Sequence, residues 1–205
     1  MKTRLHTLDQ YIVKEMNTYK PLLDLVEPED VVLDIGAHIG AFADRVRKKH
    51  GICHSYEPEP NNYILLEENI GSSVFNKIYN QAVVGSDQKS VGLYLSKTNN
   101  TGSHSTTKYR GRGMVEVPAI NVKDLKKHKP KYVKVDCEGA EYEIMDEIIN
   151  WDIQALAIEI HCFKKEWRNE KAPELLNKLR AVFPNHYKEG KITPKCWYTM
   201  FIGSK

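Results

Sequence analysis

At positions 31–40 the chain reads VVLDIGAHIG, and this stretch decides the fold. Its apolar, β-branched beginning predicts a buried strand of a parallel sheet, and its two glycines predict a tight turn. Residues 41–50 then mix apolar and charged side chains in the pattern of an amphipathic helix. A strand, a glycine turn and a helix N-terminus in this order are expected to point backbone N–H groups and the helix dipole at a ligand.

The next segment indicates what that ligand is. Residues 52–56 predict a second short strand, which ends just before Glu57. An acidic residue about 20 positions after a glycine turn, at the tip of the next strand, is placed to bind ribose hydroxyls. The sequence therefore predicts a cofactor that contains adenosine.

The spacing of the turn favours one cofactor class over another. In Gly36-x-x-x-Gly40, Ala37 and His38 stand where the close approach of a pyrophosphate requires glycine. Asp34 would repel a pyrophosphate but suits a cationic amino-acid group. These features favour S-adenosylmethionine over a nicotinamide dinucleotide, and the chain contains no P-loop sequence.

Length and composition predict one domain over residues 1–205, opening with a helical segment at 1–27. A hydrophobic content of 41% is ordinary for a globular protein, and a net charge of +3 does not indicate a nucleic-acid partner. We expect a cytoplasmic protein with no membrane span, because no apolar run is long enough and the N-terminus does not resemble a signal peptide. The four cysteines lack C-x-x-C spacing, which argues against a zinc site.

Alternating strand and helix patterns along the rest of the chain predict an α/β, doubly wound sheet. The expected helices are 60–70, 139–149 and 172–182. The further expected strands are 76–84, 90–95, 114–119, 132–136, 155–161, 188–192 and 196–202. We expect the strands 76–84 and 90–95 to pair as a hairpin through the turn between them.

The polar segment 97–113 is long for a connection inside one domain, which is typical of a functional loop. We expect it to act as a lid over the bound cofactor or acceptor. Tyr109, Arg110 and Arg112 offer an aromatic face and two cations for an anionic or sugar-like acceptor. A surface loop without a function is the alternative.

Six segments together resemble the FkbM-type S-adenosylmethionine-dependent methyltransferases. They are DIGAHIGAF (34–42), YEPEPNNYILLEENI (56–70), NQAVVG (80–85), VPAINVKDL (117–125), KVDCEGAEYEIM (134–145) and EIH (159–161). The resemblance implies the class I methyltransferase (Rossmann-like) fold, with a mostly parallel seven-stranded sheet whose last strand is antiparallel. It also implies O-methylation of a hydroxyl on a sugar, glycan or secondary metabolite. The family usually has Asn where this chain has His38.

The candidate site residues follow from these patterns. Asn80 and Gln81 end an expected strand, where the adenine edge should lie. The candidate cofactor-binding residues are Asp34, Gly36, Ala37, His38, Gly40, Glu57, Asn80, Gln81 and Asp136.

The candidate catalytic residues are Asp136, Glu159 and His161, at the carboxyl ends of two expected strands. His161 could take the proton of the acceptor hydroxyl while Glu159 orients it. Glu138 and Glu141 could be catalytic or could cap the following helix. Asp136, Glu138, Glu159 and His161 could also assemble a divalent metal site, but no spacing shows that they converge, so the sequence alone predicts no metal.

Two other functions remain open at this point. The glycine turn and Glu57 are also compatible with a nicotinamide-dependent oxidoreductase, or with a non-catalytic cofactor-binding domain of the same fold. The identity of the acceptor, the need for a metal and the oligomeric state are not encoded in any pattern that we recognise.

Overall fold

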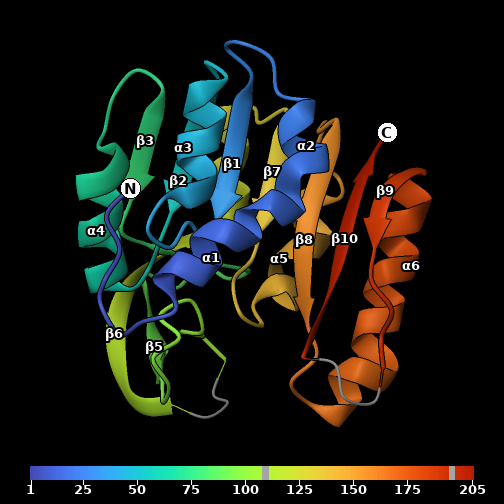
Figure 1. Ribbon diagram of the computed structural model, residues 1–205. Helices are drawn as coiled ribbons and strands as arrows, with labels where there is room; N and C mark the ends of the chain where they lie inside the picture. The colour runs from blue at the N-terminus through green and yellow to red at the C-terminus, as the bar shows by residue number, and fades with distance from the viewer. Residues whose placement is uncertain (108–110, 194–196) are drawn as a thin grey trace.

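A seven-stranded sheet forms the centre of the computed structural model, which describes residues 1–107, 111–193 and 197–205 (Figure 1). The strand order is β3-β2-β1-β7-β8-β10-β9. The strands are β1 (Val31–Ile35), β2 (Ile52–Tyr56), β3 (Asn76–Tyr79), β7 (Tyr132–Val135), β8 (Ala155–His161), β9 (Asn185–Glu189) and β10 (Tyr198–Ser204). Only β10 runs antiparallel to its neighbours β8 and β9, which confirms the predicted fold class.

Helices cover both faces of this sheet. The N-terminal helices α1 (Asp9–Glu15), η1 (Met16–Tyr19) and α2 (Lys20–Asp24) pack with α3 (Ala41–Lys48) on one face. On the other face lie η2 (Val122–His128), α5 (Glu141–Ile148) and α6 (Ala172–Val182), and α4 (Pro60–Ile70) lies beside β3. Side chains alternate along a strand, so Val32 and Leu33, both fully buried, belong to opposite cores. A run of apolar residues thus becomes a strand that is buried on both faces.

The predicted hairpin is wrong. Residues 76–84 form two strands instead of one, because the chain turns after β3, and β4 (Ala82–Val84) enters a second sheet. In that sheet β6 (Gly111–Asn121) pairs in parallel with β4 and antiparallel with β5 (Ser90–Ser96). The strand that pairs with β5 therefore comes after it in the sequence, and a separate small core closes between the three strands.

Other boundaries differ by a few residues. The N-terminal segment, where Pro21 was expected to interrupt the helical pattern, instead has Pro21 in the first turn of α2, where a proline is tolerated. Helix α5 begins two residues later than expected, because Glu138 and Gly139 both have positive φ angles. Strand β9 ends at Glu189, before most of the predicted 188–192 strand. Among the described helices, none is long and apolar enough to cross a membrane.

Candidate active site

A cavity of about 350 Å³ opens at the carboxyl ends of β1, β2, β7 and β8. This is the edge at which open α/β sheets bind their ligands. The predicted site residues that line it are Gly36, Ala37, His38, Glu57, Gln81, Asp136, Glu159 and His161. Asp34, Gly40 and Asn80 are not part of this lining, as far as the structure describes it.

The glycine turn after β1 is hydrogen-bonded to the end of β2. The amides of Gly36 and Ala37 both donate to the carbonyl oxygen of Tyr56 at 3.0 Å. The amide of His38 donates to the Glu57 carboxylate at 2.8 Å. The expectation that the N–H groups of this turn point at a ligand is therefore wrong for these three, because they hold the turn onto the end of β2.

Asp34 faces Lys134 instead of the cavity. Its side chain is fully buried, and one carboxylate oxygen lies 3.2 Å from the Lys134 Nζ. Lys134 is 2% exposed and also donates to the Gly36 carbonyl at 2.6 Å. Although burial opposes its charge, Asp34 and Asp136 raise the pKa of Lys134. Asp34 thus supports the turn through a buried cation that itself lines the cavity.

Glu57 lies at the tip of β2, as predicted, and lines the cavity. Besides the His38 amide, it accepts hydrogen bonds from the Glu59 amide at 2.9 Å and from the Asn62 side chain at 3.3 Å. Burial raises the pKa of Glu57 to about 7, although these donors favour the carboxylate. The side chain is therefore fixed in position by donors that prefer its charged form.

Asn80 and Gln81 were both expected at the adenine edge, but they have different roles in the structure. The Asn80 amide donates to the carbonyls of Glu57 and Pro58 at 2.8 and 3.1 Å, so it fixes the segment that carries Glu57. Gln81 lines the cavity beside this segment.

His161 is held between two glutamates. Its Nδ1 lies 2.8 Å from the Glu141 carboxylate and its Nε2 lies 3.3 Å from the Glu138 carboxylate. Although burial opposes its charge, these two carboxylates raise the pKa of His161 well above its usual value. The expectation that Glu159 orients His161 is wrong, because Glu141 occupies that position while it also accepts from the Cys137 and Gly139 amides in the connection before α5.

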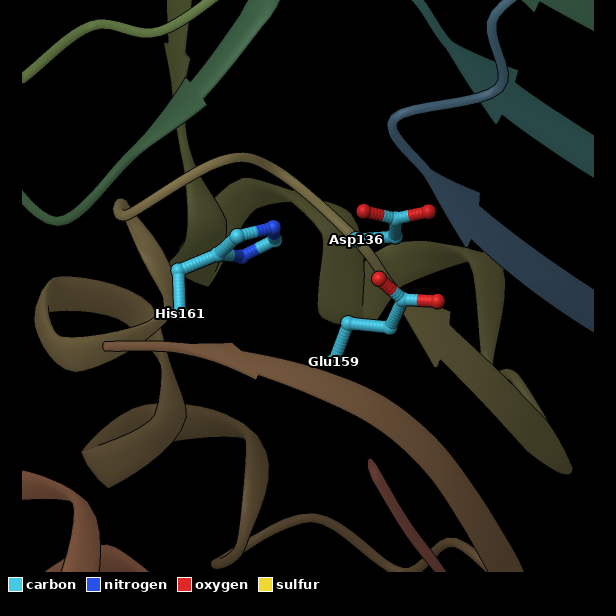
Figure 2. Close-up of side chains that lie close together, drawn as sticks. All are labelled: Asp136, Glu159 and His161. Carbon is cyan, nitrogen blue, oxygen red and sulfur yellow. The ribbon is translucent and has the colours of Figure 1, made fainter. Parts of the chain in front are cut away.

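Glu159 instead shares a hydrogen-bond donor with Asp136. The hydroxyl of Tyr19, which is fully buried in η1, lies 3.2 Å from one oxygen of each carboxylate. Burial and the neighbouring Asp136 raise the pKa of Glu159. Figure 2 shows the side chains of Asp136, Glu159 and His161 pointing toward one another, and one ligand atom from each lies within 4.8 Å of the other two.

The N-terminal segment and the 97–107 loop are fastened together above the glycine turn. Thr101 donates to the Asp9 carboxylate at 2.6 Å and contacts His38 Nε2 at 2.9 Å. Arg4 binds both oxygens of Asp9 at 3.0 Å and also donates to Asn62 at 2.7 Å. Burial lowers the pKa of His38 to about 4, so the ring is neutral in this network.

A second cavity of about 270 Å³ adjoins the first and shares Ser103, Glu138, Phe163 and Trp197 with it. The 97–107 loop forms one wall, with Tyr94 of β5 beside it. Of the residues expected to contact an acceptor, Tyr109 and Arg110 lie outside the described residues, as does the side chain of Arg112.

Three residues that shape the site have contacts that the sequence did not predict. Tyr19 gave no signal, because its contacts with Asp136 and Glu159 span 117 and 140 positions. Lys134 could have been suspected, since a charged residue in the middle of a buried strand requires a partner. For Glu141 the sequence left a catalytic role and a helix-capping role open, and it did not predict the contact with His161.

A family model and a sequence relative both connect this chain with methyltransferases. A model of the methyltransferase FkbM domain matches residues 34–187. The hexuronic acid methyltransferase AglP of Haloferax volcanii is 27% identical over 153 residues, which make up 72% of this chain and 62% of that protein. The chain therefore spans less than two thirds of the length of this relative.

Solved methyltransferase structures share the fold at low sequence identity. The C-terminal domain of precorrin-6Y C5,15-methyltransferase from Rhodobacter capsulatus has a TM-score of 0.54 at 12% identity, covering 93% of this chain and 88% of that one. The magnesium protoporphyrin IX methyltransferase of Synechocystis PCC 6803, solved with bound S-adenosylmethionine, has a TM-score of 0.52 at 8% identity, covering 100% and 86%. Together with the strand order, these likenesses identify the class I methyltransferase fold.

Proposed function

Because the chain belongs to the family of FkbM-domain methyltransferases, we propose that it transfers a methyl group from S-adenosylmethionine to a hydroxyl of a sugar, glycan or secondary metabolite. The relative from Haloferax volcanii, which methylates a hexuronic acid, supports a sugar-like acceptor. The observation that carries the proposal is the single cavity in which Glu57 and the group Asp136, Glu159 and His161 lie together.

The residues on the β1 and β2 side of the cavity fit the cofactor. Glu57 offers carboxylate oxygens to ribose hydroxyls, and Gln81 offers an amide to the adenine edge. The carboxylates of Asp136 and Glu159 suit a sulfonium or ammonium cation nearby. When bound, S-adenosylmethionine supplies an electrophilic methyl group, and the residues of this chain position it and receive the acceptor.

We assign the acceptor hydroxyl to the side of the cavity that holds Asp136, Glu159 and His161. As the hydroxyl oxygen bonds to the methyl carbon, the carbon–sulfur bond breaks and the hydroxyl proton is lost. The carboxylates of Asp136 and Glu159 have ligand atoms within 4.8 Å of each other and of His161, and one of these carboxylates can accept that proton. The adjoining cavity beside Phe163 and Trp197 gives room for the rest of the acceptor.

Because β6 already begins at Gly111, the expected 97–113 loop is shorter than predicted, and we further propose that its described part, 97–107, is a lid that governs access to both cavities. Thr101, Gly102, Ser103 and His104 belong to the lining of the first cavity, and Thr101 links the loop to the N-terminal segment through Asp9. Opening this contact would expose the cavity without disturbing the central sheet.

Binding measurements separate this function from its alternatives. By calorimetry, the purified protein should bind S-adenosylhomocysteine and should not bind NADH. Binding of NADH alone would instead indicate an oxidoreductase, and binding of neither would refute the proposal. A radiolabelled methyl-transfer screen over uronic acids, neutral sugars and phenols then tests turnover, and cofactor binding without turnover on any acceptor would favour a non-catalytic domain.

Variants of the acceptor side provide the matched test. Asp136→Asn should lower turnover by a factor of about 100 or more, since it removes a negative charge from beside the acceptor hydroxyl. Glu143→Gln, an exposed residue of α5, is the control and should leave turnover unchanged.

A further inference from the structure

Three side chains of the acceptor side form a set of ligands suited to a metal ion. Asp136 follows β7, while Glu159 and His161 lie two residues apart at the end of β8, and all three point toward one another (Figure 2). One oxygen of each carboxylate and one imidazole nitrogen lie within 4.8 Å of one another. We propose that Asp136, Glu159 and His161 bind a divalent cation in this cavity.

The distances are close to those of a filled site. Neighbouring ligands of a cation at about 2.2 Å stand roughly 3 Å apart, so the three side chains would have to close by no more than about 2 Å. The strands that carry them do not have to move, because β7 and β8 pair in register beneath the site, with Val135 opposite Ile158.

Carboxylates outnumber cationic side chains around the site, which favours the binding of a cation. Five carboxylates gather here, from Asp34, Asp136, Glu138, Glu141 and Glu159, and among the described residues their ion-pair partners are Lys134 and His161. Lys134 is engaged mainly elsewhere, since its Nζ lies 2.6 Å from the Gly36 carbonyl and 3.7 Å from Asp136. A divalent cation would offset the excess of negative charge in a largely buried place.

The hydrogen bonds leave one oxygen of the Asp136 carboxylate and one of the Glu159 carboxylate available to a cation. Tyr19 donates to Oδ2 of Asp136 and Oε1 of Glu159, and no group in the described ranges donates to the other oxygen of either carboxylate. Glu141 holds Nδ1 of His161, which fixes the ring as a metal-bound histidine is usually fixed by an outer carboxylate. Nε2, which lies 3.3 Å from the Glu138 carboxylate, is then the ligand atom: the cation would displace the proton between them, and Glu138 would stand where a fourth ligand would.

The ligand set indicates which cations fit. Two or three carboxylates with one imidazole suit Mn²⁺ or Mg²⁺ better than a thiophilic metal. The cation would complete its shell with water or with oxygens of the acceptor, and would thereby position the hydroxyl that is methylated. That role rests on the proposed function, whereas the binding of the cation does not.

Mn²⁺ is a suitable probe, because its free concentration is measured directly by electron paramagnetic resonance. Titration of the full chain, with and without saturating S-adenosylhomocysteine, should reveal one saturable site per chain that Mg²⁺ displaces. Electron spin echo modulation of bound Mn²⁺ should contain a nitrogen coupling from His161. Glu159→Gln and His161→Gln should each weaken Mn²⁺ binding by a factor of about 10–100. Glu143→Gln should leave it unchanged.

Three results would overturn the proposal. The first is no saturable Mn²⁺ binding by the folded wild-type protein, a measurement that needs no variant. The second is a bound ion without nitrogen coupling, and the third is affinity that survives both Glu159→Gln and His161→Gln. Binding of S-adenosylhomocysteine without Mn²⁺ would mean that the carboxylates serve the cationic cofactor alone, whereas Mn²⁺ binding without S-adenosylhomocysteine would refute the proposed function and leave the metal site standing.

Discussion

Replacing Gly36 with alanine tests how tightly the glycine turn fits against the site. A Cβ at Gly36 would lie 1.8 Å from the carbonyl oxygen of Asp136, and ordinary contacts begin at 3.4 Å, so the Asp136 backbone would have to move by roughly 1.6 Å. The φ angle of Gly36 is +80°, where an L-residue costs about 1–2 kcal/mol. Adding about 1–3 kcal/mol for the overlap gives an expected loss of about 2–5 kcal/mol in unfolding free energy.

Thermal unfolding followed by circular dichroism measures this loss. For a chain of this length 1 kcal/mol corresponds to about 2–4 °C, so the Tm should fall by about 4–20 °C. Affinity for S-adenosylhomocysteine should fall as well, because Asp136 moves with its backbone. The matched control is Gly113→Ala in β6, where an added Cβ meets no atom within 4 Å. If the Tm of Gly36→Ala equals that of Gly113→Ala, the turn does not approach Asp136 as closely as described.

Three further predictions follow from the same contacts. Since the pKa of Glu57 is raised to about 7, its carboxylate form is gained as the pH rises through 7. Affinity for S-adenosylhomocysteine should therefore increase by up to about tenfold between pH 6 and 8, and calorimetry on Glu57→Gln should give a flat profile. Lys134→Met leaves Asp34 buried without its cation, so urea unfolding should show a loss of about 3–5 kcal/mol, much of it restored by adding Asp34→Asn. Replacing residues 103–107 with a Gly-Ser linker should spare cofactor affinity but lower turnover, and full turnover would contradict the lid.

Local patterns were sufficient for many individual elements. The strands β2 and β8 and the helices α4 and α6 have the predicted bounds, because each carries its own periodicity and its own stop signals. Pairing is not a local property. The turn before β5 has the composition of a hairpin, yet β5 pairs with β6, whose Val117 and Ala119 share one small core with side chains of β4 and β5.

In the site, too, the positions of single residues could be predicted but their long-range contacts could not. Glu57, Asp136, Glu159 and His161 could be predicted to line one cavity, because parallel strands bring their carboxyl ends to one edge. Their partners could not be predicted, since Tyr19 arrives from a helix more than 100 residues away and Glu141 replaces Glu159 beside His161. Spacing along a strand identifies neighbours on one face, but not the side chains that other elements insert between them.

The central position of β1 also affects how the protein is made. One edge of β1 pairs with β2, which follows it closely, but the other edge pairs with β7, where Val32 lies opposite Tyr132, 100 positions later in the chain. A ribosome adding about 5–20 residues per second needs about 4–15 s to pass from Tyr56 to Tyr132. During that interval the nascent chain carries an open apolar strand edge, which is a template for self-association and a binding site for chaperones.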